Sequence, residues 1–263
     1  MSTDSIHVEQ APSVQYILRL GDTALILGQR LGEWCGHAPV LEEDIALANI
    51  ALDLIGQSRA LLTRAGELEG QGHDEDQLAF LREERDYRNA TIVELPNGPS
   101  RPGDFAFTVL RNAMMATWFR LMWERLRESS DAELAAIAGK AVKEARYHQQ
   151  HSADWVVRLG DGTEESARRM CAALDTLWRY SAELFDSDAV DAAAAANGLG
   201  PRWDSLREPW LAEMREMLSE AKLPMPSESA FRSTGKTGVH TEHMGYILSD
   251  LQHLQRAYPG GVW

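Results

Sequence analysis

Apolar residues recur with a helical period along nearly the whole chain, and the alternation typical of strands is scarce. The clearest case is the segment of about 131–159, where small and apolar residues recur in alternating steps of four and three. Such steps place these side chains on one side of a helix, facing its neighbours in a bundle. The sequence therefore predicts an all-α protein built as an antiparallel helical bundle.

Caps and breakers divide this pattern into separate helices. Asp104 is a predicted N-cap, Ser130 with Glu133 forms a predicted capping box, and Gly66 is the expected end of the second helix. Residues 1–12 form a loose tail, and no linker or repeat divides the chain, so we expect one domain over 1–263. Residues 186–201 are expected as a connection. The expected helices cover about 13–33, 41–65, 75–89, 105–127, 131–159, 163–185, 203–221 and 240–258.

The charge balance restricts the partners of this chain. It has 26 basic and 40 acidic residues and a net charge of −14, so its surface repels phosphate backbones and anionic lipids. We expect no nucleic-acid or membrane partner, although a local basic pocket for an anionic small molecule stays open. No apolar run long enough to span a membrane and no signal peptide is evident. Two cysteines far apart in sequence suit the cytoplasm.

Helical bundles can hold a di-iron centre, with a Glu from each of two helices and a Glu-x-x-His pair from each of the other two. At the first such pair this chain has Leu54 and Gln57. At the second, Glu144 and His148 are one residue too far apart. The third expected helix has no Asp or Glu before Glu124, near its end. The sequence therefore predicts no metal site and no catalytic residue in this chain.

Two other interpretations of these polar residues stay open. Glu144 and His148 lie on nearly the same helix face, which suits a relict or mononuclear metal site, or a buried histidine hydrogen-bonded to Asp53 or Tyr147. A rival hypothesis is an autonomous di-iron enzyme that uses Asp22 and Asp53 with the same pair. It predicts bound iron in this chain alone.

The last expected helix opens with two histidines. His240 and His243 have the spacing of zinc ligands, but a structural zinc site needs four protein ligands and neither cysteine is near in sequence. Thr241 as N-cap and Glu242 in the first turn suit an ordinary helix start. We therefore expect a capping role here.

Eight tryptophans are many for a chain of 263 residues. Those in mid-helix suit core packing. Aromatic residues near helix ends or the tail also suit a partner surface. The residues in this second group are Trp34, Trp203, Trp210 and Trp263.

Short motifs that combine glycine, charged and aromatic residues are spread over nearly the whole chain. They are LRLGD at 18–22, QRLGEWCGHAP at 29–39, ALAN at 46–49, LDLIGQ at 52–57, KEARYH at 143–148, RLGDGT at 158–163 and HTEH at 240–243. Together they closely resemble the C subunits of bacterial phenylacetyl-CoA epoxidase, the multicomponent monooxygenase of aerobic phenylacetate breakdown. The combined match is specific, whereas any one segment alone is not.

The resemblance implies a ferritin-like bundle with additional C-terminal helices. In this family the A subunit holds the di-iron centre and epoxidises the substrate ring with O2. Electrons come from NADPH through a reductase subunit with FAD and an iron–sulfur cluster. The C subunit lacks the iron ligands and is a structural partner, so this chain would hold no cofactor and would bind the A subunit within the complex. A storage or regulatory module without an oxygenase partner is the third hypothesis.

The resemblance also implies a contact with the CoA-thioester substrate, phenylacetyl-CoA. In the family, two short stretches of the C subunit are able to touch this ligand. The matching residues here are Asp86, Tyr87, Arg88 and Asn89 in the first stretch, and Ser187, Asp188 and Ala189 in the second.

Overall fold

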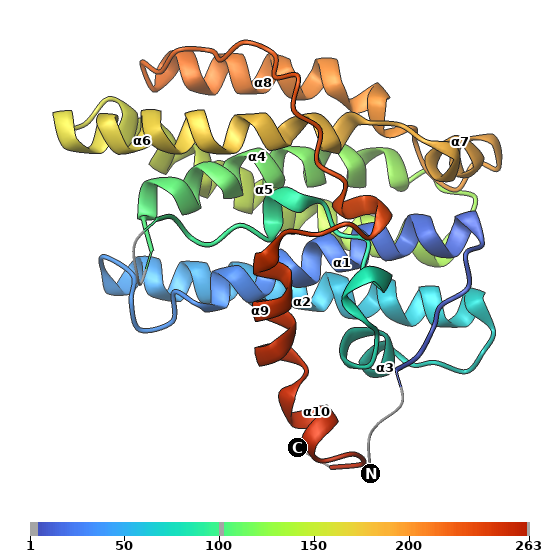
Figure 1. Cartoon of the computed structure of the whole chain (residues 1–263). Coiled ribbons are helices and arrows are strands. Elements are labelled where there is room, and N and C mark those ends of the chain that lie inside the picture. The colour runs from blue at the N-terminus through green and yellow to red at the C-terminus, as the bar shows by residue number, and fades with distance from the viewer. Residues whose placement is uncertain (1–4, 100–102, 262–263) are drawn as a thin grey trace.

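The computed structural model describes residues 5–99 and 103–261, and Figure 1 shows that helices make up its framework. Within these ranges no strand forms, and the β-type pairing consists of two isolated bridges, Ile6 with Arg82 and Thr234 with Val239. The prediction of an all-α protein is confirmed.

The long helices lie in stacked layers (Figure 1). Helices α1 (Pro12–Gly32) and α2 (Leu41–Glu69) form the lower layer, and α4 (Phe105–Leu126) and α5 (Ala132–Gly160) lie above them. Helix α1 is buried on nearly every side, including its polar residues Arg19 and Asp22. Charged groups on this central helix must therefore find partners inside the protein.

Side-chain caps mark the first residues of α4 and α5. Asp104 accepts a hydrogen bond from the Ala106 amide and caps α4, as predicted. Helix α5 is capped by Asp131, which accepts from the Leu134 amide at 2.9 Å, so the predicted Ser130 capping box is wrong. Ser130 instead donates its hydroxyl to the Asn197 carbonyl at 3.0 Å.

Helix α2 continues past its expected end. Gly66 stays helical and the helix ends at Gly70, whose φ of 71° favours glycine. The Gly70 amide donates to the Gly66 carbonyl. The prediction that Gly66 ends the helix is wrong. A glycine is needed at this position for close packing, because a Cβ there would lie 2.2 Å from the His73 carbonyl oxygen.

The helix expected over 75–89 is also wrong. The chain forms α3 (Glu75–Phe80), then the short 3₁₀ helices η1 (Glu84–Asp86) and η2 (Thr91–Val93). The side chain of Arg82 points into the core, where it donates to the Leu78 carbonyl and to both oxygens of Asp22. This burial interrupts a segment whose charged composition indicated an exposed helix.

Beyond α6 (Glu164–Leu177) the chain tightens into the 3₁₀ helix η3 (Trp178–Phe185). The expected connection over 186–201 contains another helix, α7 (Ala189–Ala196), which packs on α1. Asp188 caps it and also pairs with Arg19. The expectation of an irregular connection is wrong because these long-range contacts stabilise the alanine-rich helix.

The C-terminal part adds helices across the bundle, as expected. After the 3₁₀ helix η4 (Trp203–Leu206) and α8 (Arg207–Glu220), an extended segment leads to η5 (Gly235–Thr237), α9 (Glu242–Leu251) and α10 (His253–Ala257). Figure 1 shows α9 crossing in front of the lower layer. Near the N-terminus, the Ile6 amide donates to the Leu81 carbonyl at 3.1 Å.

The tryptophans near helix ends do not form a surface. Trp34, Trp203 and Trp210 are buried, so the interpretation of these three as partner contacts is wrong. Trp263 lies outside the described residues.

By length and composition alone, α2 is the one helix in the described chain that is long and apolar enough to cross a membrane, although the sequence led us to expect none. Core helices of soluble proteins meet the same criterion. In α2, 44% of the apolar window is buried, because one side of the helix packs on α1. We therefore interpret α2 as a core helix with one exposed face.

Candidate functional site

Polar side chains of α2 and α5 pair one to one across the bundle. His148 Nε2 lies 3.0 Å from Asp53 Oδ2, and Gln57 donates to Glu144 Oε2 at 2.9 Å. The interpretation of His148 as a locally hydrogen-bonded histidine is confirmed. Burial lowers the pKa of His148, and the Asp53 hydrogen bond opposes that effect. Burial therefore favours the neutral form of the imidazole.

The residues of this region do not fit a di-iron centre. Leu54 is buried and offers no ligand atom, and the Gln57 amide is already bound to Glu144. Asp22, a ligand in the rival hypothesis, is paired with Arg82 instead of lying with Asp53, Glu144 and His148. Across residues 5–99 and 103–261, no group of three or more histidines, cysteines and carboxylates is placed to hold a metal ion.

The two stretches expected to touch a CoA thioester both pack along α1. Arg88 donates its backbone N–H to Asp22 at 2.8 Å and its Nε–H to Gln15 at 2.7 Å. Asp188 accepts from both terminal nitrogens of Arg19, at 2.9 and 2.5 Å. Gln15, Arg19 and Asp22 are four and three residues apart, so the fold brings the two stretches to one face of this helix.

Within the first stretch, only part of the surface is open to a ligand. Tyr87 and Asn89 are fully buried, and their polar groups bind inside the protein: Tyr87 donates to the Ala79 carbonyl and Asn89 to Glu94 at 2.9 Å. Asp86 and Arg88 are half-buried. In the second stretch Ser187 and Asp188 are half-buried and Ala189 is exposed.

The segment Gly235–Thr237 lies beside the first stretch, where a Cβ on Gly235 would be 2.5 Å from the Asn89 carbonyl oxygen. The sequence did not indicate this neighbour. The Lys236 amide donates to Glu183 at 2.9 Å, and its ammonium donates to the Asp186 carbonyl at 2.5 Å beside the Trp203 ring. Burial and the nearby Arg19 charge lower the pKa of Lys236 to about 8. No local motif predicts this contact, because its partners are distant in sequence.

His240 joins the C-terminal helices to the bundle. Its Nδ1 lies 2.6 Å from Glu94 Oε1 and its Nε2 lies 3.1 Å from the Tyr87 carbonyl oxygen. Both partners are acceptors, so both ring nitrogens donate and the ring is an imidazolium. Thr241 is the N-cap residue of α9, as predicted, but its hydroxyl donates to Glu94 and does not cap the helix.

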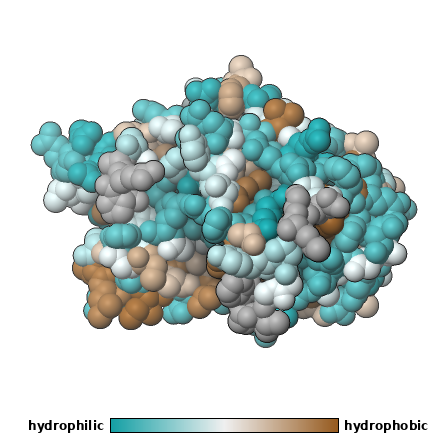
Figure 2. Space-filling model, turned by 60° about the horizontal axis from the view of Figure 1, so that its bottom comes forward, coloured by the Kyte–Doolittle hydropathy of each residue, from teal (hydrophilic) through white to brown (hydrophobic). Residues whose placement is uncertain are grey.

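An apolar surface runs along the exposed side of α2. We call it the α2 apolar face, made of Leu41, Ile45, Leu52 and Ile55. The Leu41 and Leu52 side chains are 71% and 65% exposed. Gly56 lies beside them, and a side chain there would meet nothing within 4 Å. Figure 2 shows apolar side chains gathered at the lower left of the underside, the side of the molecule where α2 lies.

The sequence of the whole chain, residues 1–263, matches the family described as "Phenylacetic acid catabolic protein". The chain belongs to this family. A curated member, the C subunit of the 1,2-phenylacetyl-CoA epoxidase of Escherichia coli (strain K12), is 51% identical to it over 248 residues. These residues cover 94% of this chain and 98% of that relative. Membership also confirms the expected ferritin-like fold, which suits the layered helices described above.

Proposed function

We propose that this chain is the non-catalytic C subunit of a cytoplasmic phenylacetyl-CoA epoxidase complex in phenylacetate catabolism. Two observations support the proposal: its similarity to a curated C subunit, and the chemistry of α2 and α5, where Leu54 and Gln57 offer no iron ligand. In this account the A subunit holds the di-iron centre and reacts with O2, and a reductase with FAD and an iron–sulfur cluster delivers electrons from NADPH. The present chain takes part in no chemical step.

The α2 apolar face supports a binding site for the partner subunit. Contiguous apolar surface that is exposed on a soluble protein marks an interaction site. Here leucine and isoleucine side chains project from a rigid core helix, and Gly56 leaves room for a partner backbone to come close. We assign this face to the A subunit, whose iron-bearing helices it would hold in place. A misplacement of about 1 Å can reduce a rate about 100-fold, so such a partner is essential without being catalytic.

Co-purification with the A subunit tests this assignment. Leu52→Glu together with Ile45→Glu places two charges in the proposed interface, and we expect the affinity for a tagged A subunit to fall by more than tenfold. Tyr246→Glu on α9 is the matched control, because Tyr246 is 72% exposed and lies on another element. Unchanged co-purification of the folded double variant would refute the assignment.

We also propose that the two α1-facing stretches contact the CoA thioester through their half-buried groups, chiefly Arg88. A guanidinium suits the phosphates of CoA. In the assembled complex, Arg88→Gln should raise KM for phenylacetyl-CoA about tenfold and leave kcat nearly unchanged, because it removes binding that is equal in ground and transition states. Steady-state kinetics test this; an unchanged KM would exclude the contact.

A further inference from the structure

The residues of the α2 apolar face have the spacing of a helix-packing seam. Leu41, Ile45, Leu52 and Ile55 are separated by steps of four, seven and three residues, and the half-buried Ala48 divides the middle step into three and four. Alternating steps of four and three allow one helix to pack lengthwise against another, at a crossing angle of about 20°. On α2 this seam lies at the surface of the chain.

The backbone of α2 restricts what can cover this seam. In the middle of a helix each N–H and C=O is already bonded within the helix, so α2 offers no backbone partner there. A strand or loop laid on the apolar side chains would bury its own N–H and C=O groups without partners, which is costly. A helix satisfies these groups internally. The face therefore fits a helix of about four turns, since Leu41 to Ile55 extends about 21 Å at 1.5 Å per residue.

Charge at the two ends of the seam indicates the direction of that helix. Glu42 is exposed in the first turn of α2, and Arg59, whose side chain is 75% exposed, lies one turn beyond Ile55. Between these ends the exposed neighbours Asn49 and Gly56 carry no charge. Acidic residues are favourable in the first turn of a helix and basic residues in the last. An antiparallel partner helix therefore places its acidic end at Arg59 and its basic end at Glu42.

The net charge favours a different chain over a second copy in this position. Each copy carries −14, and like-charged chains repel each other. The curated relative is one named subunit of an epoxidase, which suits a partner of another sequence.

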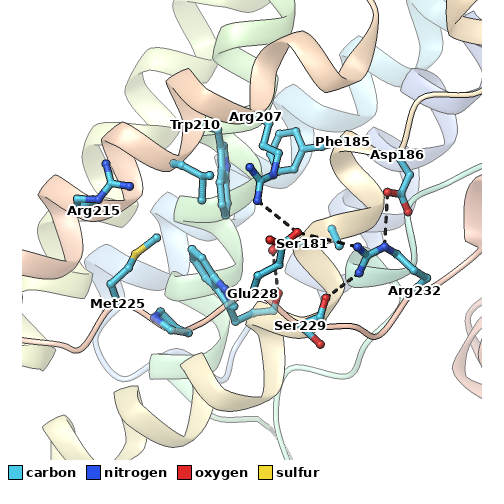
Figure 3. A pocket seen from close by; sticks show the side chains of 14 residues that line it. Ser181, Phe185, Asp186, Arg207, Trp210, Arg215, Met225, Glu228, Ser229 and Arg232 are labelled. Atoms are coloured by element: carbon cyan, nitrogen blue, oxygen red, sulfur yellow. Dashed lines mark hydrogen bonds and ion pairs between the residues drawn. The ribbon is translucent and has the colours of Figure 1, made fainter.

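The cavity between η3, α8 and the extended segment after α8 is a different kind of surface. Figure 3 shows Arg207 and Arg232 directed toward Glu228, and Arg232 also directed toward Asp186. Trp210 in its wall is fully buried. The groups of this cavity are thus used within the chain, whereas the four side chains of the α2 apolar face remain between 36% and 71% exposed.

We propose that the α2 apolar face binds one amphipathic helix of the A subunit, which lies antiparallel to α2 along its whole length from Leu41 to Ile55. The apolar side of that helix has the same alternating spacing of three and four residues. This inference rests on the proposed function, which supplies the A subunit as the partner, and adds the kind of element that binds and its direction.

Photo-crosslinking in the complex with the A subunit tests the proposal. Benzoylphenylalanine replaces Leu41 or Ile55 in separate variants, and mass spectrometry locates the crosslinked residues. We expect both sets of crosslinks in one helix of the A subunit. The residue reached from position 41 should lie about 14 residues C-terminal to the one reached from position 55, because the two helices rise equally per residue. Benzoylphenylalanine at Tyr246 on α9, which is 72% exposed, is the control and should not reach that helix.

A charge reversal tests the direction separately. Arg59→Glu should weaken the affinity for the A subunit about threefold at low salt, because an exposed ion pair is lost, and the loss should vanish in 1 M salt. Arg202→Glu is the matched control, since Arg202 is also exposed and paired with a neighbouring carboxylate, and it should bind as the unmodified chain does. Unchanged or tighter binding of Arg59→Glu would overturn the antiparallel direction.

The crosslinks also separate this inference from the proposed function. If the A subunit binds and Ile45→Glu with Leu52→Glu weakens it, but the crosslinks fall in loops, in several helices or in the parallel order, the helix inference alone is overturned. If that double variant binds normally, the assignment of the face to the A subunit fails, and the helix inference fails with it.

Discussion

At the scale of single residues, the interior of this protein depends on charges that neutralise each other far from water. Asp22 and Arg82 are both fully buried, and the aspartate also accepts the Arg88 amide. A buried charge that loses its partner keeps its desolvation cost without compensation. Such residues connect α1 to the segment after α3 and can be tested one at a time.

Asp22→Asn should lower the free energy of unfolding by about 3–5 kcal/mol, because it leaves the Arg82 charge buried and unpaired. Urea unfolding followed by circular dichroism measures this change. The control is Glu75→Gln, which breaks an exposed pair with Arg59 and should cost less than about 1 kcal/mol. A loss for Asp22→Asn no larger than for this control would contradict the account.

His240 should make stability depend on pH. Burial alone lowers its pKa, but the Glu94 carboxylate outweighs burial, and the pKa of His240 is raised above its ordinary value. When the pKa of a histidine is higher in the folded state, its ionised form stabilises the protein. The full contribution of His240 to the free energy of unfolding is present below the unfolded pKa of about 6.5 and declines as pH rises through the folded pKa. The difference in unfolding free energy between the unmodified chain and His240→Gln should therefore shrink from pH 6 to pH 9.

Urea unfolding at intervals across that range measures the effect. His37→Gln, at an exposed histidine, should follow the unmodified chain at every pH. A difference for His240→Gln that grows with pH would show that the ring is not held as an imidazolium.

At the scale of elements, helical periodicity identified the long helices, because their apolar faces reflect burial against several neighbours. The errors lie where distant contacts decide the outcome: Arg82 interrupts the expected helix after Gly70, and the Arg19 contact with Asp188 stabilises α7. The site follows the same rule. Spacing predicted that His148 faces inward and left Asp53 and Tyr147 as alternative partners, of which the structure shows Asp53. His240 contacts Glu94 at a separation of 146 residues, which no local pattern encodes.

Two glycines inside helices allow the effect of side-chain packing on stability to be compared with the effect of helix propensity. Gly66→Ala should destabilise the protein by about 1–3 kcal/mol, because the new methyl group would clash with the His73 carbonyl. Gly139→Ala in α5 meets nothing within 4 Å and should stabilise by up to about 1 kcal/mol through helix propensity. Thermal unfolding of both variants tests this pair; effects of the same sign would contradict the packing argument.

At the scale of the whole molecule, the layered bundle separates two surfaces. We propose the α2 apolar face for the A subunit and the α1-facing stretches for the CoA thioester. We propose that the chain acts as one domain, because a single apolar core extends from Val14 on α1 to Leu248 on α9. In the bundle interior, α2 and α5 carry side chains that pair with each other, His148 with Asp53 and Gln57 with Glu144.

The iron content of this chain, purified alone from iron-supplemented cells, tests that central claim most directly. The A subunit purified in the same way is the positive control. We predict near-zero iron per chain, because Leu54 and Gln57 offer no ligand and Asp22 is bound to Arg82. About two irons per chain, the content of a di-iron bundle, would contradict the account and show that this chain performs the chemistry itself.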